Sequence, residues 1–227
     1  MVLRLAESLQ LSLRERNALL LAAGYAPVFA ESRLDDDALS PVRDALHRIL
    51  AGHMPYPAVV AAPGGRLVAG NTATDVLTEG AAPEILAPPV NVLRLAVHPD
   101  GMGRRVENLA EWGRHIIDNV RANQLRNPDP RREQLLDEIE RYVPAPSPGP
   151  DHVGFAVPLR LRCDEGELHL ITTLTSFATA LDVTLAELHL EAYLPADEQT
   201  ERILRERRRR ATGHPADSFP PELVVRA

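Results

Sequence analysis

The 227-residue sequence lacks several features that would assign it to particular classes of protein. It has a single cysteine, Cys163, which excludes an internal disulfide bond and favours a reducing compartment. No apolar run approaches the roughly 20 residues that a membrane span requires. The first ten residues include acidic and polar side chains too early for a signal peptide. We therefore expect a cytoplasmic protein without a membrane partner.

Lysine is absent as well, because all 25 basic residues are arginine. Lysine codons are AT-rich, so we attribute this bias to a GC-rich coding sequence rather than to chemistry. The net charge of −7 argues against a surface built to coat DNA or an anionic membrane. The arginine run at residues 205–210, RERRRR, is therefore expected to be the solvated end of a helix.

Motifs that carry catalysis or metal binding are missing from the sequence. No two of its eight histidines have the i, i+4 spacing of a helical metal site, and no Cys-x-x-Cys pair occurs. A Gly-x-Ser-x-Gly elbow and glycine-rich nucleotide loops are also absent. Cys163 ends an apolar alternation, which is typical of a structural cysteine. We expect no catalytic residue, no metal and no cofactor.

Two helices are predicted in the first 52 residues. Ser12 and Glu15 have the spacing of a capping box, and the leucines of residues 12–23 form an apolar face. Because so short a helix needs a partner, we expect its leucines to pack on the rest of the chain or across a dimer. After a polar linker, Ser40 is expected to cap a second helix over residues 40–52.

The middle of the chain changes character. Two apolar runs around a Pro-Gly-Gly turn predict a β-hairpin over residues 56–71, followed directly by a helix. Residues 80–104 are rich in proline and glycine and predict a loop. Apolar side chains at the 3.6-residue period then predict helices over residues 105–123 and 130–142.

The C-terminal third predicts strands. Apolar residues occupy every second position from 155 to 163, and two similar runs lie at 167–177 and 184–194. Three such runs indicate an antiparallel sheet with one wet face. A last helix, capped by Asp197, precedes a tail at 211–227. The expected fold class is α+β: a PAS-like antiparallel sheet with helices packed on one face, preceded by N-terminal helices.

Several longer phrases of the sequence resemble one known family. The phrases are LSLRERNALLLAAGYAP, RLVAGNTATDVL, NVLRLAVHPDGM, NLAEWGRHIIDNVR and LITTLTSFATALDVTLAELHLEAYLPADEQT. Together with shorter matches such as PYPAVV and PLRL, they span about residues 3–204. They resemble the XRE-type helix-turn-helix transcription regulators that carry a MmyB-like ligand-binding domain. In such regulators the first phrase is the last helix of the DNA-binding head, so the recognition helix is expected to be missing here.

The resemblance implies a domain organisation. Residues 1–24 would be the remnant of the helix-turn-helix domain, and 25–52 a linker and connecting helix. Residues 53–210 would form the PAS-type ligand-binding domain, followed by a flexible tail at 211–227. Two phrases depart from the family: the first hairpin lacks an Asp-Arg pair followed by an aromatic residue, and the common HPDGL appears as HPDGM.

The function implied by the resemblance is that of a ligand sensor. We expect a homodimer that binds a small hydrophobic ligand, such as a fatty acid, and controls a DNA-binding head. A mainly apolar pocket is expected between the long helix and the sheet. Candidate polar contacts at its mouth are Asn71, Asn91 and Arg94, with Arg94 selecting a carboxylate. Candidate wall residues are Trp112, Ile116 and Phe177.

Other interpretations remain open at this point. Asn71 would equally serve as a helix cap, and Trp112 would equally belong to the core. The alternative to a ligand sensor is a dimerisation or interaction module without any ligand.

Overall fold

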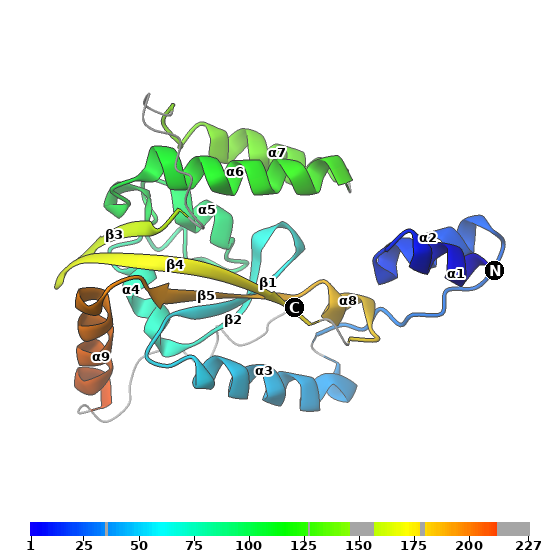
Figure 1. Ribbon diagram of the computed structural model, residues 1–227, viewed down its shortest axis with the longest axis horizontal. Coiled ribbons are helices and arrows are strands. Elements are labelled where there is room, and N and C mark those ends of the chain that lie inside the picture. The colour runs from blue at the N-terminus through cyan, green and yellow to red at the C-terminus, as the bar shows by residue number, and fades with distance from the viewer. Residues whose placement is uncertain (35, 127, 146–156, 178–179, 213–227) are drawn as a thin grey trace.

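An antiparallel sheet lies at the centre of the computed structural model, which describes residues 1–34, 36–126, 128–145, 157–177 and 180–212 (Figure 1). Its five strands lie in the order β2-β1-β5-β4-β3. Their bounds are β1 Ala58–Ala62, β2 Arg66–Gly70, β3 Leu159–Cys163, β4 Gly166–Ser176 and β5 His189–Pro195. Helices are inserted between β2 and β3 and also precede β1, which confirms the predicted α+β class.

The predicted hairpin joins β1 and β2 through the short 3₁₀ turn η2, Pro63–Gly65. Gly65 has a φ of +80°, a backbone conformation that residues with a Cβ rarely adopt. A Cβ at this position would also lie 2.7 Å from Cγ of Leu93. The turn therefore requires glycine twice over, and this close approach brings the hairpin against the segment that follows Asn91.

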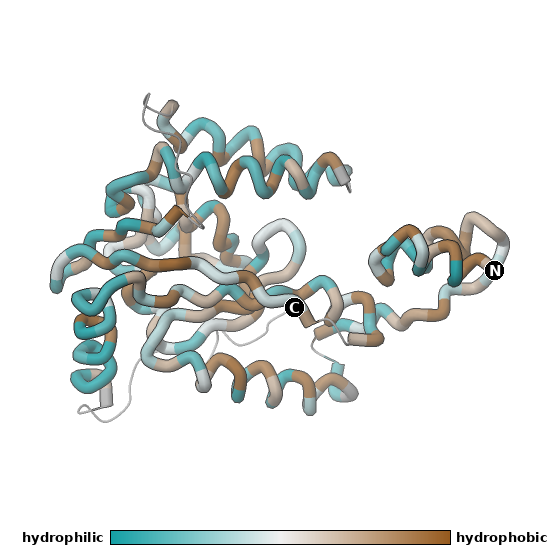
Figure 2. Tube along the Cα trace, in the orientation of Figure 1, coloured by the Kyte–Doolittle hydropathy of each residue, from teal (hydrophilic) through white to brown (hydrophobic). Residues whose placement is uncertain are grey.

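Three helices inserted between β2 and β3 cover one face of the sheet. They are α5 (Val92–Val97), α6 (Leu109–Arg126) and α7 (Pro130–Glu140). The main hydrophobic core lies between these helices and the buried side chains of β3 and β4. Brown and teal residues alternate along α6 in Figure 2, as its 3.6-residue apolar period predicts.

The long helix α6 begins later than predicted. Residues 103–105 form the 3₁₀ turn η4, and Val106 makes an isolated antiparallel bridge to Leu161. The N–H of Glu107 then donates to the carbonyl of Arg160 at 2.8 Å. Pairing with β3 therefore delays the start of the helix to Leu109, and the helix ends at Arg126, three residues later than predicted.

The opposite face of the sheet is covered by α3 (Ser40–Gly52), which precedes the first strand. Its Leu46 and Leu50 pack in a second core with Val60 of β1 and Leu190 of β5. Ser40 does not cap this helix: Leu39 occupies the N-cap position, no side chain there bonds the backbone, and Ser40 is the first helical residue. The 3₁₀ turn η1 (Asp37–Leu39) leads directly into α3, so Ser40 lies inside the helix rather than at its N-cap.

The N-terminal helices α1 (Val2–Ser8) and α2 (Leu13–Ala22) lie apart from the sheet in Figure 1. Both hydrogen bonds of the predicted capping box are present on α2. Leu20 is buried, whereas Leu21 is 59 % exposed. The two helices contact the rest of the molecule through an ion pair of 2.6 Å between Arg14 of α2 and Glu187. Glu187 directly follows α8 (Val183–Ala186).

Two further elements close the remaining end of the sheet. The 3₁₀ turn η3 (Thr72–Thr74) runs into α4 (Asp75–Thr78) directly after β2. The last helix, α9 (Glu198–Thr212), packs against β4 and β5. The described part of the predicted tail, residues 211–212, still belongs to α9, and residues 213–227 lie outside the described residues. Among the described residues, no helix has both the length and the apolarity to cross a membrane.

Candidate functional site

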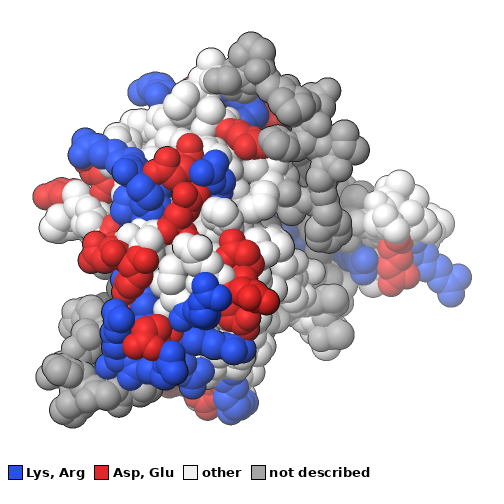
Figure 3. Space-filling model, turned by 60° about the vertical axis from the view of Figure 1, so that its left-hand side comes forward, with Lys and Arg blue, Asp and Glu red and all other residues white. Residues whose placement is uncertain are grey.

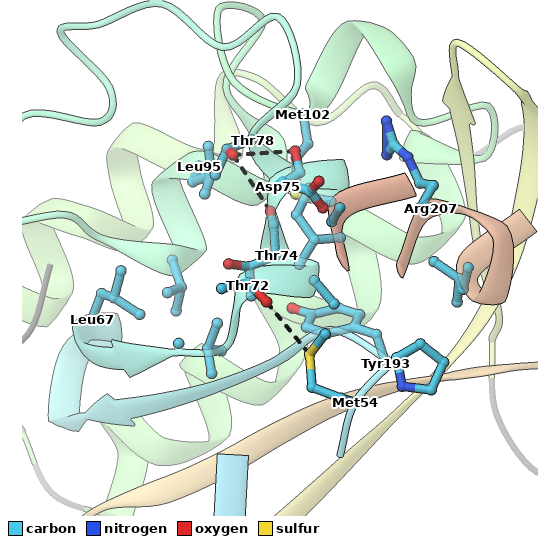
Figure 4. Close-up of a pocket in the computed structure, with 18 of the residues that line it drawn as sticks. Met54, Leu67, Thr72, Thr74, Asp75, Thr78, Leu95, Met102, Tyr193 and Arg207 are labelled. Atoms are coloured by element: carbon cyan, nitrogen blue, oxygen red, sulfur yellow. Dashed lines mark hydrogen bonds between the residues drawn. The ribbon is translucent and has the colours of Figure 1, made fainter. Parts of the chain in front are cut away.

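A cavity of about 730 Å³ opens between four parts of the chain. The β1–β2 hairpin, the η3–α4 segment, the α5 helix with the loops beside it, and α9 each supply part of its wall (Figure 4). Ligand pockets in proteins have volumes of roughly 300–1,000 Å³ and mainly apolar walls, and this cavity meets both criteria. It is therefore large enough for a small organic molecule.

Small side chains leave this space empty. The end of β2 and the following turn read GNTATDVLT, and this stretch contributes Gly70, Thr72, Ala73, Thr74 and Thr78 to the wall. The hydroxyl groups of the threonines are engaged locally: Thr74 donates to the carbonyl of Asn71 at 2.7 Å, and Thr78 to the carbonyl of Asp75 at 3.2 Å. The wall thus presents mainly methyl groups to the cavity.

The side opposite the hairpin is formed by α5 and the HPDGM loop. Leu95 of α5 and Met102 of the loop both line the cavity. The N–H of Met102 donates to the carbonyl of Leu95 at 2.8 Å, and a Cβ on Gly101 would lie 2.4 Å from that same oxygen. Glycine before Met102 is therefore what allows the loop to turn against α5 and place the methionine in the wall.

One face of α9 completes the enclosure. Leu204, Arg207, Arg208 and Ala211 line the cavity, and they follow the i, i+3, i+4, i+7 spacing of a single helix face. The helix is anchored by Thr200, which is fully buried and whose Oγ1 accepts a hydrogen bond from the N–H of His169 at 2.9 Å. The cavity therefore lies against the last helix of the described chain.

Tyr193 of β5 also lines the cavity and is almost fully buried. Its hydroxyl donates to Oε2 of Glu191 at 3.2 Å. Burial raises the pKa of the Tyr193 hydroxyl well above its ordinary value, and the adjacent Glu191 carboxylate raises it further. Burial also raises the pKa of Glu191. Tyr193 therefore stays neutral and presents a mainly aromatic surface.

Charged side chains gather at one corner of the cavity. Arg207 donates from Nη2 to Glu79 at 2.6 Å and from Nε to Glu165 at 3.1 Å. Its third nitrogen, Nη1, is buried and has no hydrogen-bond partner among the described residues. Asp75 lies opposite, and Figure 4 shows its carboxylate on the side of α4 that faces Arg207.

The titration of Asp75 reflects this setting. Burial against the cavity wall raises the pKa of its carboxyl group above the ordinary value, and the Arg207 charge opposes this shift. The N–H of Val76 donates to Oδ1 of Asp75 at 2.6 Å and also lowers the pKa. The corner thus combines an acceptor, Asp75, with an unused donor, Nη1 of Arg207.

A small apolar cavity with one polar corner is what a ligand-binding domain provides. Residues 42–206 match the sequence profile of the MmyB-like transcription regulator ligand binding domain. The chain belongs to this family. No curated protein matches the chain. The match includes every cavity residue up to Leu204, and only the last turns of α9 extend beyond it.

The residues selected from the sequence lie outside the lining of this cavity. Asn71 is buried and bridges α3 to β1: its Oδ1 accepts from the N–H of Ala58 at 3.1 Å. Its Nδ2 donates to the carbonyls of Leu50 and Tyr56 at 3.1 and 2.8 Å. It makes no capping bond to η3, so its role in the structure is to join two elements of the ligand-binding domain.

Asn91 and Arg94 stand at the start of α5. Oδ1 of Asn91 caps the helix by accepting from the N–H groups of Leu93 and Arg94, both at 3.0 Å, and its Nδ2 donates to the carbonyl of Gly64 at 2.7 Å. The Arg94 guanidinium forms a bidentate pair with Glu138 of α7 at 2.5 and 2.7 Å. Both side chains are therefore committed to holding α5 in place.

The three apolar candidates are divided between the two cores. Trp112 is 4 % exposed in the main core, and Ile116 packs against the same cluster. Phe177 packs against the second core, on the α3 side of the sheet. The structure therefore brings Trp112 and Ile116 together on α6 but separates Phe177 from them.

Many of the residues that do line the cavity were present in the family phrases. RLVAGNTATDVL contains the small side chains of the wall, NVLRLAVHPDGM contains Leu95 and Met102, and the end of the last phrase contains Tyr193. The signal that would have found them is the run of small residues after a strand. The helical spacing of Leu204, Arg207 and Ala211 is a second such signal.

Proposed function

We propose that this chain is the sensor part of a transcription regulator and that it binds a small hydrophobic ligand with an acyl chain in the cavity beside α9. The observation that carries the proposal is the cavity itself, with its apolar wall of methyl groups, Leu95, Met102 and Tyr193. Membership of a family of ligand-binding domains supports the same conclusion. Five antiparallel strands with helices inserted after the first two also support a PAS-like sensor fold.

The size of the expected effect follows from burial of the chain. Each CH₂ group removed from water contributes about 0.8 kcal/mol. A chain of about eight such groups would then contribute roughly 6 kcal/mol, which corresponds to a dissociation constant on the order of tens of micromolar. Polar contacts at the charged corner would add to this value.

Titration calorimetry with decan-1-ol tests the proposal, and Ala73→Trp supplies a variant with a blocked cavity. Ala73 lines the cavity, so an indole there would fill the space and abolish saturable binding. Ala22→Trp is the matched control, because Ala22 is exposed at the end of α2 and lies outside the cavity lining. Equal binding by both variants would show that the ligand site is elsewhere.

We further propose that the domain controls an XRE-type helix-turn-helix head, of which α2 would be the last helix. The proposal rests on the resemblance of the first phrase and on the position of α2 apart from the sheet. Gel-shift titration of a fusion to such a head, with and without decan-1-ol, tests it. A DNA affinity that does not change with ligand would contradict a sensor role.

A second candidate function is association between two copies of the chain. The observation that favours it is a set of apolar residues in the N-terminal region with exposures of 52–62 %, namely Leu5, Leu9, Leu21, Tyr25 and Val28. Size-exclusion chromatography with light scattering would show a dimer that Leu9→Glu and Leu21→Glu together dissociate. A monomer at all accessible concentrations would exclude a dimerisation role for these helices.

A further inference from the structure

The charge of Arg207 is already balanced before any ligand arrives. Its guanidinium holds Glu79 and Glu165, and the three side chains are only 18 %, 20 % and 23 % exposed. Glu79 is itself fixed by the N–H of Asp164, which donates to its Oε1 at 3.0 Å. The two carboxylates are therefore held in position, and what Arg207 can still offer is the hydrogen bond of Nη1 rather than an unpaired charge.

Asp75 adds a third carboxylate on the cavity side of this group. Its Oδ1 accepts from the N–H of Val76, and no ion pair joins its carboxylate to Arg207 within the described part of the chain. Asp75 and Arg207 therefore lie at the same corner of the cavity (Figure 4), and Nη1 of Arg207 is a buried donor without a partner among the described residues.

The other cations near this corner do not change the balance at Asp75. Arg105 donates to the main-chain carbonyls of Val76 and Leu77, with which it joins α4 to the loop before α6. Arg208 is exposed at the rim and is already engaged in an interaction of its own. Blue and red side chains are interspersed over the side of the molecule that holds α9 and β3 in Figure 3.

From this arrangement we propose that the polar end of the ligand is uncharged, and that it donates to the Asp75 carboxylate while accepting from Nη1 of Arg207. A primary or secondary amide has both groups in suitable positions, and an alcohol has both on one oxygen. A ligand carboxylate can only accept, and it would lie beside three carboxylates. A ligand ammonium can only donate, so it would leave Nη1 of Arg207 without an acceptor.

The inference rests on the proposed function, because it names the chemical class of ligand for the same cavity. It differs from the expectation that an arginine selects a carboxylate ligand. Here Arg207, which lines the cavity, is shared by two carboxylates of the protein itself, so its remaining nitrogen discriminates by hydrogen bonding rather than by charge.

The experiment compares four ligands with one chain length at neutral pH: decanamide, decan-1-ol, decanoic acid and decylamine. Titration calorimetry of the intact protein should give the tightest binding for decanamide, with decanoic acid and decylamine weaker by about tenfold or more. Asp75→Asn should then improve binding of decanoic acid about tenfold while changing that of decanamide by less than about threefold. Asp118→Asn, an equal loss of charge on the exposed face of α6, is the matched control and should leave the four affinities unchanged.

The outcomes separate the two proposals. If decanoic acid binds the wild-type protein more tightly than decanamide, the ligand carries an anionic head and the inference is overturned, whereas the binding function stands. An unchanged affinity for decanoic acid in Asp75→Asn would also overturn it, because the discrimination would then not come from Asp75. If none of the four ligands binds, the proposed function itself fails and the inference fails with it.

Discussion

Two corners of the same sheet face are built very differently. Between α5, α6 and α7 the space is filled by large side chains, among them Trp112, Ile117 and Ile139. Between α4, α5 and α9 the wall contains Gly70 and Ala73, and a cavity of about 730 Å³ remains. Large aromatic and branched residues therefore fill the packed part of this fold, whereas a short run of small residues lines the cavity.

The polar groups of the two corners differ in the same way. Arg94 and Glu138 satisfy each other in a bidentate pair, so neither needs a ligand. Arg207 bonds two carboxylates and still has a buried nitrogen without a partner among the described residues. A buried donor that stays unbonded costs free energy, and binding of a ligand can recover that cost. The arginine of interest is therefore the one with an unmet hydrogen bond.

The largest expected effect comes from emptying the filled corner. Trp112→Ala should lower the free energy of unfolding by about 3–5 kcal/mol, because it removes a side chain that is 96 % buried in the main core. Urea denaturation followed by circular dichroism measures this change. Binding of decan-1-ol to the fraction that stays folded should be unchanged. A selective loss of ligand binding with full stability would instead place Trp112 in the site and overturn the comparison.

The next largest effect is expected at Asn71, whose side chain joins α3 to β1. Asn71→Ala should cost about 3 kcal/mol, because it leaves the N–H of Ala58 and the carbonyls of Leu50 and Tyr56 without their partner. Chemical denaturation provides the value, and Asn119→Ala on exposed α6 is a control of the same chemistry. A loss of ligand affinity without any loss of stability would return Asn71 to the list of ligand contacts.

A smaller and local effect is expected in the N-terminal helices, which belong to neither corner. Leu20→Glu buries a charge between α1 and α2 and should destabilise this pair by about 2–3 kcal/mol. Hydrogen exchange should show faster exchange of residues 1–22 with little change in the strands. Ala22→Glu, at an exposed neighbouring position, is the control for protection. Equal loss of protection in the sheet would show that α1 and α2 are integral to the body.

The smallest effect is expected for the bidentate ion pair between Arg94 and Glu138. Arg94→Ala should cost about 0.5–1 kcal/mol near neutral pH, because both side chains are partly exposed and water screens the pair. The Arg94 hydrogen bonds lower the pKa of Glu138 below its ordinary value. The ion pair therefore makes its full contribution to the free energy of unfolding above the ordinary glutamate pKa of about 4.3. This contribution is lost as the pH falls through the lowered pKa of Glu138.

Thermal unfolding of both proteins between neutral and acidic pH checks this prediction. The difference in unfolding temperature between wild type and Arg94→Ala should shrink below about pH 4. Ligand affinity should not change in this variant. If Arg94→Ala weakened binding of decanoic acid more than of decan-1-ol, Arg94 would contact the ligand after all.

Local patterns in the sequence determined the elements of this protein. The capping box before α2, the Pro-Gly-Gly turn between two apolar runs, and the alternation that ends at Cys163 all act over a few neighbouring residues. Such signals can be found in one dimension because hydrogen bonding and side-chain direction repeat along a helix or strand. The predicted start of α6 was wrong because Val106, expected in its first turn, forms a β-bridge with Leu161 instead, about 55 positions away.

Only the tertiary structure decided where the cavity lies and which polar groups are left to serve it. A cavity is space that no side chain fills, so it depends on segments as distant as Met54, Leu95 and Ala211 meeting with short side chains between them. The difference between Arg94 and Arg207 likewise depends on partners 42 to 128 positions away in the sequence. Residue type alone gives the possible hydrogen bonds of an arginine, and the folded chain determines which of them remain unmade.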